Sequence, residues 1–201
     1  MTIQCKICNQ RRAKRHCPGA DGEICALCCS EGREVTIECP RECPHLREAR
    51  MHEAKVVLIA EQVLHRDIDV SEDFVRRHEH LVLMLGNTLT RAMEKGKAVD
   101  SDAREALEAM IQTYRTAQSG LIYETRPPNR YAADIQDELK QMIDELRKRV
   151  EEADSTSSVR DADLLGTLIF LQRLGLQNDN GRRRGRVFYD FLMDHFPAVP
   201  A

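Results

Sequence analysis

From residue 46 onward, apolar residues recur at steps of three and four positions, which is the spacing of one face of an α-helix. Six segments follow this spacing, and turn-forming or polar stretches separate them. They span residues 46–64, 71–96, 102–121, 130–153, 164–175 and 187–196. The pattern predicts a mainly α fold, in which residues 46–201 form an α-helical bundle of five to six helices.

Two of these segments also carry signals for where a helix begins or ends. Ser71 is followed by two acids, so its hydroxyl can cap a helix whose positive end the acids stabilise. Asp102 and Glu105 have the spacing of a capping box, which predicts a further helix start at Asp102. Pro127 and Pro128 end that helix, because proline lacks the amide donor and restricts the residue before it.

Residues 1–45 lack helical periodicity and contain turn pairs such as Pro18-Gly19. Residues 34–39 alternate between polar and apolar, which predicts one short strand. A segment of this size cannot bury enough surface to fold alone. We therefore expect a separate small domain over residues 1–45, in which bound metal supplies the missing stability.

The cysteines indicate which metal this is. All 8 lie between residues 5 and 43, and two CxxC pairs, Cys5/Cys8 and Cys25/Cys28, begin 20 positions apart. A CxxC turn presents two thiolates to one metal, and two such pairs at this separation favour zinc. An iron–sulfur cluster is the competing cofactor, since thiolates hold either metal. The run Cys25-x2-Cys28-Cys29 resembles the CxxCC runs of some small bacterial metal-binding proteins. Disulfides apply only if the chain is exported.

The spacing C-x2-C-x8-C-x7-C-x2-C resembles the B-box zinc fingers that precede coiled coils in tripartite-motif proteins. The resemblance is closest over residues 17–28, CPGADGEICALC, where B-boxes have a cysteine, an acid and a hydrophobic residue before a CxxC pair. It implies a cross-braced fold with two zinc ions, in which alternate ligand pairs share one ion. The ligands carried over to this chain are Cys5, Cys8, Cys25 and Cys28 for the first ion, and Cys17, Cys29, Cys39 and Cys43 for the second.

The chain departs from the B-box pattern in two places. B-boxes end in a pair of histidines, whereas this chain ends its ligand stretch in cysteines and one histidine, His45. The acid Asp21 lies four positions after Cys17 rather than three. The fourth ligand of the second ion therefore stays open between Cys29, Asp21 and His45. The longer insertion before Cys39 is also similar to the zinc finger of HIT-type proteins, and both resemblances imply a protein-interaction module rather than an enzyme.

Two basic clusters stand out in a chain whose net charge is -3. They consist of Arg11, Arg12, Lys14 and Arg15 in the finger, and of Arg182, Arg183, Arg184 and Arg186 before the last helix. Such clusters can bind the phosphates of DNA or RNA. No aromatic stacking residues accompany them, so solvated loops, or pairing with the acids of residues 134–152, are the simpler interpretation.

Composition and missing motifs narrow the function further. Apolar residues make up 42% of the chain and aromatics 4%, which predicts an aliphatic core. The longest apolar run, residues 56–60, is too short to span a membrane, so we expect a cytoplasmic protein with no membrane partner. No GxSxG, Walker, GxGxxG or HExxH motif occurs, and we name no catalytic residue. The sequence favours a non-enzymatic zinc-binding interaction or regulatory protein with a protein partner; homo-oligomers through the helices, nucleic-acid binding and a metalloenzyme remain alternatives.

Overall fold

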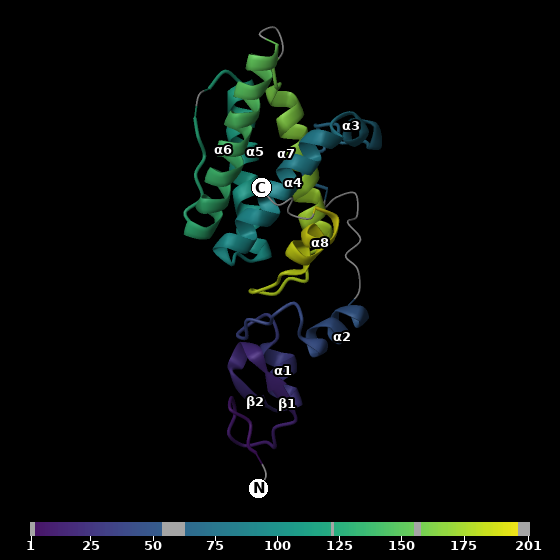
Figure 1. Ribbon diagram of the computed structural model, residues 1–201, viewed down its shortest axis with the longest axis vertical. Coiled ribbons are helices and arrows are strands. Elements are labelled where there is room, and N and C mark those ends of the chain that lie inside the picture. Colours follow the sequence, from purple (N-terminus) through teal and green to yellow (C-terminus); the bar gives the residue numbers. More distant parts are fainter. Residues whose placement is uncertain (1–2, 54–62, 122, 155–157, 197–201) are drawn as a thin grey trace.

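The structure, a computed structural model, describes residues 3–53, 63–121, 123–154 and 158–196. It consists of a small N-terminal part, residues 3–53, and a larger bundle of helices, which lie end to end (Figure 1). We call residues 3–43 of the N-terminal part the finger. The described residues form eight α-helices and one two-stranded sheet near the N-terminus. The protein is therefore mainly helical, as the hydrophobic pattern predicts.

The finger begins with a small hairpin. Strand β1 (Arg15–Cys17) pairs antiparallel with strand β2 (Gly22–Ile24). The connection is a single 3-10 turn, η1 (Pro18–Ala20), followed by Asp21 in the left-handed region with φ 47°. The pairing sets Cys17 opposite Gly22, so the hairpin fixes the third cysteine of the chain relative to the CxxC pair that follows β2.

Two helices complete this part of the chain, α1 (Ala26–Gly32) and α2 (Pro44–His52). The strand predicted over residues 34–39 is wrong. The carbonyl of Gly32 accepts the N–H groups of Val35, Thr36 and Ile37, so the chain turns back immediately after α1. Only an isolated bridge between Arg33 and Ile37 is left of the expected strand.

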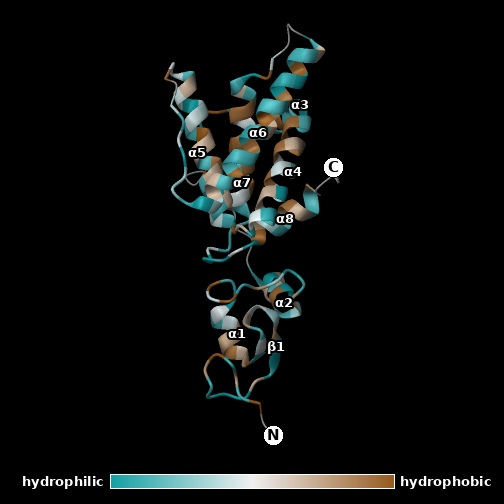
Figure 2. Ribbon diagram, turned by 60° about the vertical axis from the view of Figure 1, so that its left-hand side comes forward, coloured by the Kyte–Doolittle hydropathy of each residue, from teal (hydrophilic) through white to brown (hydrophobic). Residues whose placement is uncertain are grey.

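Six helices form the bundle. They are α3 (Glu72–Arg77), α4 (Glu79–Gly96), α5 (Asp100–Gln118), α6 (Arg130–Ala153), α7 (Asp161–Gln177) and α8 (Val187–His195). Helix α5 packs along α6 and α7, α4 packs on the same two helices, and the short α8 contacts α4 and α5. Apolar and polar residues alternate along these helices (Figure 2), as expected for helices that bury one face.

The helix boundaries differ from the predicted ones at several places. Pro127 and Pro128 do not end the third predicted helix, because α5 already ends at Gln118. The segment expected over 71–96 is split at His78 into α3 and α4. The next helix begins at Asp100, because the Asp102 carboxylate accepts the N–H of Val99 at 2.9 Å and is the third residue of the capping box, not its first. In the first segment α2 ends at His52, and residues 54–62 lie outside the described residues. The Ser71 cap is confirmed, since its hydroxyl accepts the N–H of Phe74 at 3.3 Å.

Buried apolar side chains form two separate clusters, one in the finger and one in the bundle. The bundle cluster is mostly aliphatic and includes the fully buried Leu107 and Leu89, with Phe188 of α8 and Phe196 directly after that helix. The finger cluster consists mostly of cysteines. No helix in the described residues is both long and apolar enough to cross a membrane.

Candidate metal centre and the arginine loop

Two local turns present the CxxC pairs. In the first, Cys5 N–H bonds to the carbonyl of Arg11 and Asn9 N–H bonds to the carbonyl of Cys5, each at 2.8 Å. Asn9 has a φ of 50°, in the left-handed region that lets the chain turn tightly. In the second, Cys25 caps α1 and its sulfur accepts the N–H of Cys28 at 3.4 Å. Each turn thus directs its two sulfurs to the same side.

The two turns bring the sulfurs of Cys5, Cys8, Cys25 and Cys28 together, all within 4.8 Å of one another. Three of these residues are buried and Cys8 is half-buried. A tetrahedral zinc with Zn–S bonds of about 2.3 Å needs sulfurs about 3.8 Å apart. A small contraction of this group therefore gives a closed four-thiolate site, which is compatible with zinc.

The pKa values of Cys5 and Cys28 shift in opposite directions, which shows how a bound cation would change the ionisation of the cluster. Burial raises the pKa of Cys5, but N–H groups of Cys8, Cys25 and Ile7 outweigh it and lower this pKa to about 6. Burial, together with the neighbouring sulfurs, raises the pKa of Cys28 to about 12. Negative charge on one sulfur therefore opposes ionisation of the next. A bound divalent cation removes this opposition and allows four thiolates.

Two arginines of the first basic cluster, Arg11 and Arg15, contact cysteine sulfurs. A hydrogen bond to the Cys25 sulfur is the main cause that raises the pKa of Arg11, and the charge of Cys8 adds to it. The Arg15 Nη1 atom lies 3.4 Å from the sulfur of Cys29. The contact of Arg11 fits the excess negative charge that four thiolates around one divalent ion would carry, whereas Arg15 contacts a sulfur outside this group.

The second ligand set is less compact. Cys17 and Cys29 are buried in the finger cluster. Burial raises the pKa of Cys39, and the charges of Glu34, Cys17 and Cys43 raise it further, which places Cys39 near those sulfurs. No second group of three or more ligand atoms within 4.8 Å of one another exists in the described part of the chain.

The two alternatives for its fourth ligand point elsewhere. The Asp21 side chain is fully exposed and lies 3.7 Å from the Lys6 ammonium. The His45 Nδ1 atom lies 3.9 Å from Glu48 on the next turn of α2. Neither side chain belongs to a ligand group in the described residues, so the structure leaves the choice open.

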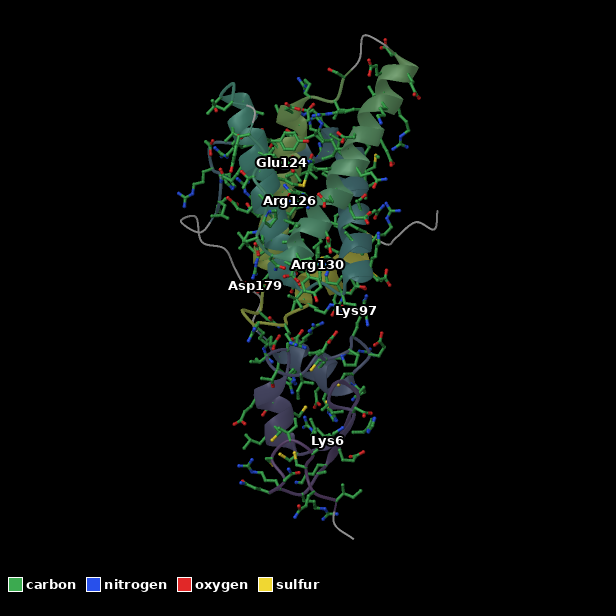
Figure 3. The ribbon with its side chains drawn as sticks, turned by 90° about the vertical axis from the view of Figure 1, so that its left-hand side faces the viewer. Lys6, Lys97, Glu124, Arg126, Arg130 and Asp179 are labelled. Atoms are coloured by element: carbon green, nitrogen blue, oxygen red, sulfur yellow. The ribbon has the colours of Figure 1, made fainter. Side chains whose placement is uncertain are left out.

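The second basic cluster lies in a loop, residues 181–186, which we call the arginine loop. Gly181, with φ 66°, begins it, and the Gly185 N–H closes it onto the carbonyl of Arg182 at 3.0 Å. Figure 3 labels Asp179, which directly precedes the loop, at the end of the bundle that faces the finger. The loop therefore lies between the two parts of the protein.

The partners of the arginine loop belong to the finger and α2. The Arg182 guanidinium lies 3.0 Å from Glu53, and Arg184 lies 3.6 Å from Glu38. The expectation that the loop pairs with residues 134–152 is thus wrong for these two arginines. Arg186 stacks on the ring of Tyr189 at 4.2 Å. Arg183 is exposed, and its side chain makes no hydrogen bond or ion pair within the described ranges.

Glu34 is the centre of this interface. Glu34 is only 1% exposed. Its backbone φ of 51° is rare for a residue other than glycine. Its carboxylate accepts the Arg50 guanidinium at 2.5 Å, the Asn180 amide at 2.8 Å and the Arg186 N–H at 3.2 Å. Arg50 also binds Asp190 of α8. This network joins the turn after α1, helix α2, the arginine loop and α8.

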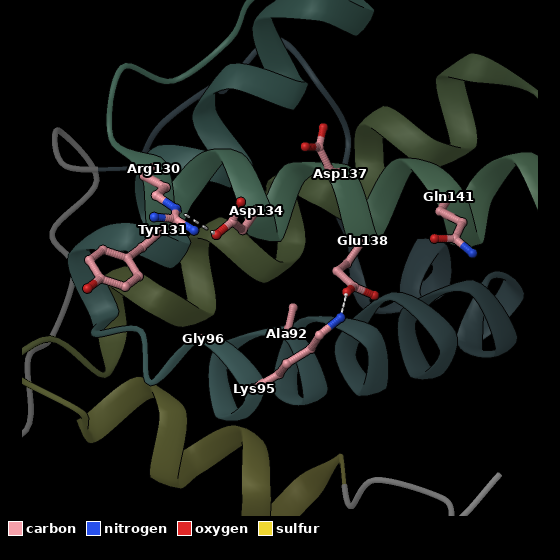
Figure 4. A pocket seen from close by; sticks show the side chains of 9 residues that line it. All are labelled: Ala92, Lys95, Gly96, Arg130, Tyr131, Asp134, Asp137, Glu138 and Gln141. Carbon is pink, nitrogen blue, oxygen red and sulfur yellow. Dashed lines mark hydrogen bonds and ion pairs between the residues drawn. The ribbon is translucent and has the colours of Figure 1, made fainter.

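The bundle has a groove of its own between α4 and α6, with a volume of about 600 Å³ (Figure 4). Two of its three acids pair with bases from the same walls, and the third, Asp137, pairs with Arg126 outside them. Lys95 lies 2.5 Å from Glu138, and Arg130 lies 3.8 Å from Asp134. The groove therefore presents little net charge and no unpaired ligand set.

No protein-family model, curated protein or solved structure matches this chain. The argument for function consequently rests on the four-cysteine cluster and on the network at the finger–bundle interface. The cluster supports a zinc-binding protein, and it is the residue group that the CxxC spacing indicates from the sequence. The sequence gives no comparable signal for Glu34, Arg50 or Asp190, since single charged residues in polar stretches resemble any solvated surface.

Proposed function

We propose that the protein is a non-enzymatic zinc-binding interaction or regulatory protein, with two zinc ions in a cross-braced, B-box-like finger. The observation that carries the proposal is the four-sulfur cluster of Cys5, Cys8, Cys25 and Cys28. Cys17 lies between the two pairs in sequence but outside their cluster. Such interleaving is what a cross-brace requires.

The second ion would be held by Cys17, Cys39 and Cys43, with Cys29 as the fourth ligand. The electrostatic influence of Cys17 and Cys43 on Cys39 supports this set. The exposure of Asp21 and the pairing of His45 favour Cys29 over them. A short metal-bound segment over residues 39–43 would then lead directly into α2.

Closed coordination is the reason for proposing a structural rather than a catalytic metal. Four protein thiolates leave no position on zinc for water or substrate. Iron held by the same thiolates is the alternative, and it would give the protein a redox centre. Metal identity separates these two proposals.

A protein partner is supported by the apolar side chains that the finger and α2 expose. Ile7 and Leu27, which lie within the two CxxC turns, are 47% and 42% exposed, and Met51 is 80% exposed. Exposed apolar side chains on a small module are a feature of interaction surfaces. Nucleic-acid binding is the second candidate, because Arg12, Lys14 and Arg183 are exposed and their side chains make no hydrogen bond or ion pair within the described residues.

Elemental analysis of protein purified without added metal tests the proposal. We expect two zinc ions per chain and almost no iron. Cys25→Ser should reduce the zinc content by one ion and Cys39→Ser by the other, while Ser30→Ala, on the same finger, should leave it unchanged. One zinc in the unmodified chain would remove the second site and the cross-brace, and stoichiometric iron would overturn the zinc assignment.

A further inference from the structure

The arginine loop is seated on a peptide segment of the finger, and the contacts show which chemistry it recognises. The Arg184 N–H donates to the backbone carbonyl of Glu34 at 2.7 Å, and the Arg186 N–H donates to the carboxylate of the same residue at 3.2 Å. The Arg184 guanidinium reaches Glu38, four residues further on. The loop thus binds one backbone carbonyl and two carboxylates of a short acidic segment, residues 34–38.

This pattern favours a peptide over a nucleic acid as the ligand of the loop. A phosphate chain offers anionic oxygens but no amide carbonyl between them. The aromatic ring next to the loop, Tyr189, is 7% exposed and already carries Arg186, so it is not available for stacking a base. Guanidinium groups bind carboxylates well in planar, two-bond geometry.

The interface that holds the finger on the loop is polar and imperfectly satisfied. Arg33 Nε, Arg50 Nε, Arg186 Nε and Asp190 Oδ1 are buried atoms with no hydrogen-bond partner among the described residues. Burying such atoms opposes docking, since each loses its bonds to water. The ion pairs of Arg182 and Arg184 are partly exposed, and pairs of this kind add little stability. The ion pairs that Arg182 and Arg184 of the arginine loop make with Glu53 and Glu38 are therefore contacts that can exchange.

We propose that the arginine loop is a binding site for an acidic peptide segment of a partner protein, and that the turn at residues 33–38 occupies this site in cis. The finger is then both the zinc module and the cover of the loop. A partner that presents carboxylates at the spacing of Glu34 and Glu38 replaces this turn. The inference rests on the proposed function, because it names the class of partner that such an interaction protein binds.

A binding experiment on the full chain tests this. The probe is a fluorescent peptide with the sequence of residues 31–42 in which Cys39 is replaced by serine, and its matched control carries glutamine at both Glu34 and Glu38. The cover is weakened by Glu38→Gln with Glu53→Gln, which removes both loop ion pairs. Glu151→Gln with Glu152→Gln makes the same charge change on exposed positions of α6, far from the loop.

We expect the cover variant to bind the acidic probe about fivefold more tightly than the unmodified protein, as the loss of two weak pairs implies. The α6 variant should bind like the unmodified protein, and the control peptide should not bind. Adding Arg182→Gln and Arg184→Gln to the cover variant should abolish binding. Hydrogen exchange at the amides of residues 182–186 should be faster in the cover variant, which shows the opening without any ligand.

Equal affinity of the cover and α6 variants for the probe would overturn the inference. So would tighter binding of single-stranded oligothymidylate than of the acidic peptide, because the loop would then be a phosphate site. Zinc content is measured for every variant. An unchanged zinc content together with either of these results overturns the inference alone and leaves the proposed zinc-binding function standing.

Discussion

The finger and the bundle differ in the side chains that fill their interiors. Seven buried residues form the finger cluster, and five of them are cysteines, with Ile24 and Ile37 as the others. The bundle cluster contains 26 buried residues and no cysteine. Removing aliphatic surface from water stabilises the bundle, whereas the finger buries little such surface and we expect it to need metal.

The boundary between the finger and the bundle is polar, unlike the interiors of both parts. It is built from ion pairs and backbone hydrogen bonds around Glu34 and the arginine loop, and the two apolar clusters share no residue across it. Metal ligation, hydrophobic packing and polar docking are therefore separable in this chain. Each can be removed while the others are monitored.

Metal removal should give the largest effect. A strong chelator is expected to unfold the finger, because structural zinc contributes on the order of 10 kcal/mol in such modules. Far-UV circular dichroism should retain most of its helical signal, since the bundle core contains no ligand. Hydrogen exchange should rise in residues 5–43 and change little in α5. Complete loss of the helical signal would show that the bundle needs the finger.

Leu107→Ala tests the opposite half of the comparison. Leu107 is 0% exposed, and truncation of such a side chain costs about 3 kcal/mol through lost burial and the cavity left behind. Urea unfolding measures the loss, and zinc content should not change. Leu83→Ala on α4, at a position 42% exposed, is the matched control and should shift the free energy of unfolding by less than about 0.5 kcal/mol.

The smallest expected effect concerns Asp100, which fixes the start of α8. Its carboxylate accepts the N–H groups of Phe188 and Tyr189 at 3.0 Å, and burial raises its pKa to about 7 despite these bonds. A raised carboxyl pKa stabilises the fold at low pH, and this contribution is lost as the pH rises through 7.

The unfolding free energy of the unmodified protein, relative to that of Asp100→Asn, should therefore fall by about 1 kcal/mol between about pH 6 and 7.5. Denaturant titrations at several pH values measure this difference. Asp144→Asn, at an exposed position of α6, should show no such pH dependence. A difference that stays constant between pH 6 and 7.5 would contradict the raised pKa, because Asp100 would then be ionised throughout this range and act mainly through its two N–H bonds.

Much of the architecture was predictable from local sequence. Apolar periodicity placed five of the six bundle helices, and the Ser71 cap gave a correct boundary near Glu72. The proline pair does not end α5, which already ends at Gln118. The split at His78 was missed because the apolar stripe continues through it. The strand at 34–39 was predicted from alternation alone, whereas the turn is imposed by three bonds to one carbonyl of Gly32.

The cysteine cluster was predictable for the same reason as the helices. A CxxC turn is a local structure, so its presence and its ligand chemistry can be read from four consecutive residues. The sequence by itself determined a cysteine-rich segment suited to metal ahead of a mainly helical region. Which pairs converge depends on the hairpin, and the gathering of Cys5, Cys8, Cys25 and Cys28 is a property of the fold. The second site and its fourth ligand stay predictions.

Only the tertiary structure decided what the arginine loop contacts. Arg182 and Glu53 are far apart in the chain, and the sequence offers many acids of equal charge nearer to the loop. Long-range ion pairs leave no periodicity, because any acid can neutralise any base until packing fixes the distance. Burial of Glu34 is likewise invisible in a polar stretch of sequence. Hydrophobic spacing and ligand spacing are written along the chain, whereas the pairing of charges is decided only when the finger and the bundle meet.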